Sequence, residues 1–176
     1  MGALYRLSVK LMVAIGKAVN ISSKGKYPGD ILSNMRSNKF TFDDVSCGSM
    51  EGFLQSLKCE DVSHQQDVCG LKGNEARRAA TSQWQRDQRL WWKGQPIDRQ
   101  SEEFQALVRR AYAALFEQNT RFRMALMSTK GKKLYYLNGR KDPRKTILTA
   151  QEFCQILTEL RTQNEDKKMF GTGSRH

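Results

Sequence analysis

The chain has 176 residues, and 30 Lys and Arg against 18 Asp and Glu give it a formal net charge of +12. This length suffices for one domain with a single core. The charge favours an anionic partner without deciding between nucleic acid, a phosphorylated nucleotide and an acidic surface.

The cysteines, at positions 47, 59, 69 and 154, form no Cys-x-x-Cys pair, and the chain has only two histidines. Zinc ligands stand in closer clusters, so this spacing argues against a metal site. Reduced thiols in a cytoplasmic protein are the simplest interpretation. We expect no metal and no cofactor.

Residues 1–20 are moderately apolar but are interrupted by Arg6, Lys10 and Lys17. The longest unbroken apolar run, residues 11–15, is too short for a membrane span or a signal peptide, and we expect no membrane partner. We predict that residues 1–25 form an N-terminal extension that packs on the domain as a strand or a helix, the alternative being an extension poorly tethered to it.

The domain predicted for residues 26–162 begins with a turn-rich run, YPGDILSN at residues 27–34. Such runs place small polar side chains at the rim of a cleft. Residues 38–43 alternate polar and aromatic side chains, as a half-buried strand does. A second turn at residues 46–49 supplies Ser49 as the N-cap of the next helix.

Residues 50–59, MEGFLQSLKC, predict an amphipathic helix. Glu51, Gln55 and Lys58 fall in one stripe, and Glu51 lies in the first turn, where the helix dipole favours a carboxylate. The apolar side chains gather on an adjacent side: Met50, Phe53, Leu54 and Leu57. The polar stripe is either a solvated surface or a row of a carboxylate, an amide and an ammonium facing a pocket.

Residues 60–82 predict two short helices, because Gly70 and Gly73 interrupt the pattern. Arg77 and Arg78 belong to the second helix. Adjacent arginines can bind a phosphate or can lie on a solvated face; we take Arg78 as the candidate for binding.

Residues 83–96 carry all three tryptophans interleaved with cations. Aromatic rings beside cations can stack a base while neutralising its backbone, which is typical of single-stranded nucleic acid or nucleotide binding. Trp91 and Trp92 are the candidates from this pattern. The alternative is that tryptophans fill the core and the charges point outward.

Residues 101–161 predict three helices and one strand with short connections. In chain order they are a helix capped by Ser101, a helix over 120–127, a strand over 132–137 closed by an Asn-Gly turn, a basic loop over 140–145 and a helix over 146–161. Residues 163–176 are polar and are predicted to form a disordered tail. The elements together predict a helix-dominated α+β fold with a few short strands.

Several motifs occur in the order that the NADAR family, also called YbiA-like proteins, shows. They are GDILSN from residue 29, MEGFLQSLK from residue 50, ARRA from residue 76, FEQN from residue 116 and LMST from residue 126. In the family the first two read G-D-x-S-N-F and S-E-H-Y-x-Q-x-x-K. The chain therefore resembles that family over roughly residues 26–161, which implies a single YbiA-like domain.

The resemblance implies a hydrolase that cleaves an N-glycosidic bond between ribose and a base or amine. Family substrates include phosphoribosylamino-pyrimidine intermediates of riboflavin synthesis, and some members remove ADP-ribose from guanine bases. By this resemblance Glu51 stabilises the sugar cation or activates water, and Lys58 holds the phosphate or the leaving base. Ser33 and Asn34 bond ribose hydroxyls or the base edge, and Gln55 orients a neighbour.

The second half of the motif set departs from the family. Tyr136 stands where members carry a glutamate, and the loop at residues 138–146 lacks the family's Trp-Gly-x-Gly. Asp142 is the candidate to replace the lost carboxylate. Met35 stands where an aromatic residue is common, and Gly52 replaces a histidine.

Three functions remain open from the sequence. The first is an N-glycosidase on a phosphorylated or ADP-ribosylated nucleotide-like molecule, including an ADP-ribosyl-guanine hydrolase that acts on DNA. The second is a module that binds ADP-ribose or a related nucleotide without cutting it, which the altered loop favours. The third is a basic nucleic-acid-binding protein.

Overall fold

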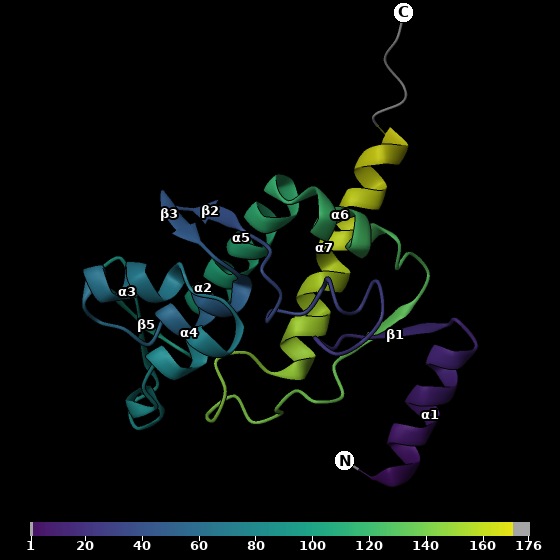
Figure 1. Ribbon diagram of the computed structural model, residues 1–176, viewed down its shortest axis with the longest axis horizontal. Helices are drawn as coiled ribbons and strands as arrows, with labels where there is room; N and C mark the ends of the chain where they lie inside the picture. The colour runs from purple at the N-terminus through teal and green to yellow at the C-terminus, as the bar shows by residue number, and fades with distance from the viewer. Residues whose placement is uncertain (1, 171–176) are drawn as a thin grey trace, which may run out of the picture.

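Seven α-helices and three two-stranded sheets make up residues 2–170, which the computed structural model describes (Figure 1). The helices are α1 (Ala3–Ala14), α2 (Met50–Ser56), α3 (Val62–Cys69), α4 (Gly73–Ala79), α5 (Glu102–Gln118), α6 (Thr120–Met127) and α7 (Ala150–Phe170). The strands are β1 (Ala18–Asn20), β2 (Phe40–Phe42), β3 (Val45–Cys47), β4 (Arg89–Trp92), β5 (Gln95–Asp98) and β6 (Lys133–Tyr135), with a 3₁₀ turn, η1, over Gln83–Gln85. The predicted helix-dominated α+β fold is confirmed.

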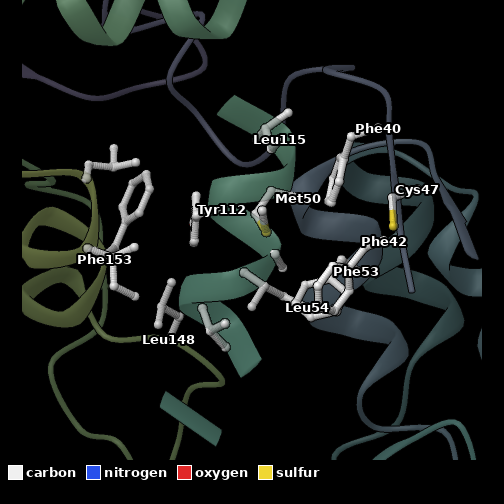
Figure 2. Close-up of a cluster of buried hydrophobic side chains, with 14 of the residues drawn as sticks. Phe40, Phe42, Cys47, Met50, Phe53, Leu54, Tyr112, Leu115, Leu148 and Phe153 are labelled. Carbon is white, nitrogen blue, oxygen red and sulfur yellow. The ribbon is translucent and has the colours of Figure 1, made fainter. Parts of the chain in front are cut away.

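Helix α5 forms the centre of the core. Ser101 caps it, with its hydroxyl accepting a hydrogen bond from the Phe104 amide at 3.1 Å. Its buried side chains recur at three- and four-residue intervals: Phe104, Leu107, Val108, Ala111, Tyr112 and Leu115. Figure 2 shows Tyr112 between Phe153 of α7 on one side and the cluster around Phe53 of α2 on the other. Both halves of the domain therefore pack on one helix.

The sheets are small and fix local turns. Strands β2 and β3 pair antiparallel around Asp43 and Asp44, both of which have positive φ. Strands β4 and β5 pair antiparallel around Lys93 and Gly94. Strands β1 and β6 pair in parallel, with Ala18 opposite Lys133, and this pairing ties the N-terminal segment to the domain.

The last helix differs from its prediction at both ends. It begins at Ala150, four residues late, because Thr149 and Glu152 form a capping box: each side chain bonds the other's backbone amide, at 2.7 and 3.1 Å. It continues to Phe170, so the predicted end at residue 161 is wrong. No Gly or Pro follows to stop it before residue 171. Residues 163–170 of the predicted tail are therefore helical, and residues 171–176 lie outside the described residues.

The N-terminal extension contacts the domain through few residues. In α1 only Val9 is buried, and the Tyr5 ring meets the edge of the Tyr135 ring with centroids 6.4 Å apart. Over residues 2–170, every helix is too short or too polar to cross a membrane.

Candidate functional site

Helix α2 is held in place by its first turn. The Ser49 hydroxyl accepts a hydrogen bond from the Gly52 amide at 3.0 Å, as the cap prediction required. The Glu51 amide donates to the Asn34 carbonyl at 3.0 Å, which fixes the 33–35 loop beside the helix. A Cβ on Gly52 would lie 2.4 Å from the Leu71 carbonyl oxygen, so only glycine permits this close packing of α2.

The helix ends three residues before its predicted end at Cys59. The Leu57 carbonyl accepts a hydrogen bond from the Trp91 amide of β4 at 2.8 Å instead of continuing the helical pattern. The Lys58 and Cys59 amides bond carbonyls three residues back, at 3.1 and 2.9 Å. This tight last turn still places Lys58 on the same side as Gln55.

Three polar side chains along α2 and one of α4 form a continuous hydrogen-bonded row. The Gln55 amide nitrogen donates to Glu51 Oε1 at 2.9 Å, and Lys58 Nζ donates to Gln55 Oε1 at 2.6 Å. At the other end Arg77 Nε of α4 donates to Glu51 Oε1 at 2.7 Å. The Glu51 side chain is only 7% exposed, so this is a buried, paired carboxylate and not a solvated surface charge.

The two oxygens of Glu51 differ in their surroundings. Both bonds end on Oε1, and no described residue donates a hydrogen bond to Oε2. The pairing therefore holds the carboxylate in one orientation and leaves one oxygen available to a bound molecule.

Burial also changes the pKa of Lys58. The pKa of Lys58 lies below its ordinary value because desolvation by burial disfavours the ammonium. Attraction to Glu51 opposes this shift, and repulsion from Arg77 adds to it. The ammonium therefore releases its proton more readily than an exposed lysine does.

The row lines a pocket of about 370 Å³. The far wall comes from the segment between β6 and α7 and contributes Tyr136, Arg140 and Lys145. With Lys58 and Arg77, the lining holds four cations against the single carboxylate of Glu51. Such a balance suits a phosphorylated ligand.

The side chains of Asn34 and Tyr136, which also line the pocket, are held in place by their neighbours. The Tyr112 hydroxyl donates to Asn34 Oδ1 at 2.7 Å, which sets the orientation of the Asn34 amide. The Tyr136 ring meets the Phe153 ring edge-on at 5.4 Å. A Cβ on Gly139 would lie 2.5 Å from the Tyr136 ring, so that ring has little freedom to move.

Four of the predicted site residues line this pocket together: Asn34, Glu51, Gln55 and Lys58. Ser33 does not line it. Its buried hydroxyl accepts a weak hydrogen bond from the Met35 amide at 3.4 Å, which shapes the loop that presents Asn34.

The remaining predicted residues lie outside the pocket lining. Trp92 is buried between Phe42 and Phe53 and donates its indole N–H to Asp43 at 2.9 Å, so it belongs to the core. Trp91 lies half-buried in β4, where its backbone carbonyl accepts from the Gln65 side chain. For Trp92 the structure supports the core alternative over stacking on a ligand, and Trp91 lies outside both the pocket lining and the buried core.

Asp142 and Arg78 are both exposed and lie outside the pocket lining. Asp142 Oδ1 accepts a hydrogen bond from the Arg144 amide at 2.9 Å, and its side chain is about half exposed. Arg78 lies on the exposed side of α4, one helical position from the arginine that bonds Glu51.

Sequence reasoning missed residues contributed by other segments: Arg77, Trp84, Arg140 and Lys145. The pair of adjacent arginines was a signal for the first, and the basic loop was a signal for the last two. Trp84 lies in a 3₁₀ turn with no periodicity to indicate which side is buried.

The domain matches known proteins in sequence and in fold. The model of the family described as Bacteriophage protein GP30.3 matches residues 26–162. The chain belongs to this GP30.3 family. A relative from Enterobacteria phage T4, described as an uncharacterized 17.1 kDa protein in the Gp30-rIII intergenic region, is 36% identical over 146 residues, 81% of this chain and 96% of the T4 protein.

The GP30.3-family chain also resembles a solved structure. The NMR structure of the E. coli protein YbiA superposes with a TM-score of 0.63 at 20% identity, covering 91% of this chain and 90% of YbiA. The predicted YbiA-like fold is thereby confirmed. Helix α1 lies before the first residue matched by the family model.

Proposed function

We propose that this protein is a hydrolase that cleaves the N-glycosidic bond between ribose and a base or amine in a phosphorylated or ADP-ribosylated nucleotide-like substrate. The observation that carries the proposal is the buried carboxylate of Glu51, held by Arg77 and Gln55 at the wall of a basic pocket. The YbiA-like fold is consistent with it.

The chemistry requires an anion close to the sugar. When the base leaves, positive charge develops on the ribose, and a fixed carboxylate stabilises it without reorganisation. Glu51 supplies that charge, and its free oxygen Oε2 orients the attacking water and accepts its proton. Arg77 and Gln55 hold the group in place through Oε1.

The leaving base must take up a proton as the C–N bond breaks. Lys58 is suited to this step because desolvation lowers its pKa, which makes its ammonium a stronger acid. Asn34, with its amide oriented by Tyr112, bonds a ribose hydroxyl or the base edge. Arg140 and Lys145 on the far wall bind the phosphate.

The test is incubation of the protein with four substrates: ADP-ribose, NAD, a phosphoribosylamino-pyrimidine and ADP-ribosylated DNA. Chromatography then measures the two products of cleavage: the ribose-containing product and the base or amine, which for the last substrate is the unmodified DNA. The proposal predicts release of both in equal amounts from at least one substrate.

A binding function is the second candidate, favoured by Tyr136 on the pocket wall in place of the glutamate implied by the NADAR resemblance. In that case ADP-ribose raises the melting temperature while no product forms from any of the four substrates. That result would overturn the hydrolase proposal.

A further inference from the structure

Helix α1 uses only one side to contact the domain. Val9 is its single buried residue, and Met12, on the same side, is half-buried. Figure 1 shows α1 projecting from the rest of the molecule beyond β1. Tyr5 and Arg6 also contact the domain, at Tyr135 and Leu137, so the contacts of α1 with the described part of the chain are confined to this side and its edges.

The outward side of α1 is apolar. Leu4, Leu7 and Leu11 are 83%, 64% and 61% exposed, and at 100° per residue they fall within about 60° of one another. Of the nine strongly exposed large apolar side chains in the described residues, six lie between positions 4 and 15. Single exposed leucines need no explanation, but a stripe of this kind indicates an interaction surface.

The charge beside the stripe is entirely positive. Lys10 lies on its flank, whereas Arg6 lies toward the domain, where its guanidinium donates a hydrogen bond to the Leu137 carbonyl at 3.4 Å. Residues 1–29 hold five cations and no carboxylate, since the first acid is Asp30. Two more lysines, Lys17 and Lys133, lie where β1 meets β6, and the Lys133 amide donates a hydrogen bond to the Lys17 carbonyl at 3.1 Å.

These charges decide between the surfaces that could cover the leucines. A second copy of the chain would place like charges against one another. Nucleic acid would pair with the cations but offers no apolar layer to the leucines. An anionic lipid surface supplies both the negative headgroups and the acyl boundary.

We propose that α1 is an interfacial helix that binds an anionic lipid bilayer. Leu4, Leu7 and Leu11 insert below the headgroups of one leaflet, and Lys10 contacts lipid phosphates. The expectation of no membrane partner was based on the shortness of the apolar run. A short run excludes a helix that crosses the bilayer, but it does not exclude a helix that binds the bilayer surface. The inference is independent of the proposed hydrolase activity, because α1 contributes nothing to the pocket lining.

The test is cosedimentation of the full chain with vesicles of equal parts phosphatidylglycerol and phosphatidylcholine, compared with pure phosphatidylcholine. The wild type is expected to bind the anionic vesicles. The double variant L7S/L11S keeps every charge and should lose at least about tenfold in partitioning, because two apolar side chains no longer insert. The matched control V62S/M124S removes two exposed apolar side chains elsewhere and should bind as the wild type does.

Three results would overturn the proposal. The first is no binding of the wild type to anionic vesicles. The second is equal binding by L7S/L11S and the wild type, which would assign vesicle binding to overall charge. The third is a leucine-dependent dimer in sedimentation equilibrium without lipid, which would make the stripe a self-association surface.

Discussion

At the scale of single residues, the site depends on which of two adjacent arginines faces Glu51. Arg77 Nε lies 2.7 Å from the carboxylate, whereas Arg78 points to solvent. Both arginines have the same chemistry, and both lie in α4. Periodicity places them 100° apart but does not say which position faces the pocket, because the loops before α4 set its rotation.

Replacing Arg77 by methionine should weaken both the fold and the activity. The change leaves a buried carboxylate with one fewer partner, which costs several kcal/mol when both groups are buried. Since the Arg77 side chain is half exposed, we expect a smaller loss of about 1–2 kcal/mol. Urea unfolding measures this, and R78M is the matched control, expected within about 0.5 kcal/mol of the wild type. Equal losses in the two variants would contradict the assignment.

The acid role of Lys58 predicts a pH dependence. Its lowered pKa means that the ammonium loses its proton below the ordinary 10.5, so the rate should fall as pH rises through that lowered pKa. K58R cannot give up its proton in this range, so it should lower kcat/KM and remove this alkaline limb. An alkaline limb that is unchanged in K58R would exclude Lys58 as the group that titrates.

Lys58 also has a stability consequence with a definite sign. Between the lowered pKa and 10.5 the unfolded chain holds more protons at this residue than the folded protein does. The contribution of Lys58 to the free energy of unfolding therefore rises with pH across that window.

At the scale of elements, the position of α2 against the turn between α3 and α4 is set by Gly52. A Cβ there would come within 2.4 and 2.5 Å of the Leu71 and Cys69 carbonyl oxygens. Both are backbone atoms that cannot move without shifting α3 and α4 as well.

G52A should therefore destabilise the protein by about 1–3 kcal/mol, the usual cost of overpacking, and should lower activity by displacing Glu51. The matched control is G70A, since a Cβ on Gly70 meets nothing closer than 3.5 Å and its φ of −67° suits alanine. The urea unfolding midpoints of the two variants, compared with that of the wild type, measure this difference in stability. A G52A midpoint equal to that of G70A would show that α2 can shift at little cost.

The helices were predictable from local patterns, but most of the short strands and some helix ends were not. Gly70 and Gly73 marked the break between α3 and α4, and residues 120–127 were predicted as the helix that α6 forms. The end of α2 depends on a hydrogen bond from Trp91, far along the chain. Such long-range contacts leave no local signal.

At the scale of the whole molecule, the pocket is assembled from segments more than a hundred residues apart. The half of the pocket that the sequence predicted consists of the loop ending at Asn34 and the polar stripe on α2. In these two segments the spacing and the residue types are informative. The far wall, with Tyr136, Arg140 and Lys145, joins it only when α7 packs on α5. No pattern within residues 138–148 indicates that contact.

The cations of that wall predict a salt effect that distinguishes substrate classes. If Arg140 and Lys145 each neutralise one DNA phosphate, KM for ADP-ribosylated DNA should rise about tenfold between 50 and 200 mM salt. The variant R140Q/K145Q should lose most of that dependence. A free metabolite should show little change in either protein. A KM for the DNA substrate that does not vary with salt would point to a metabolite as the natural substrate.

The central claim is that Glu51 directs water to the anomeric carbon of a ribose, and a single-turnover reaction in ¹⁸O water tests it most directly. Mass spectrometry of the rapidly quenched products should find one ¹⁸O in the released sugar and none in the base. E51Q should slow this release at least about 100-fold while substrate binding stays within about tenfold, or 1.4 kcal/mol. Release by E51Q at the wild-type rate would contradict the account.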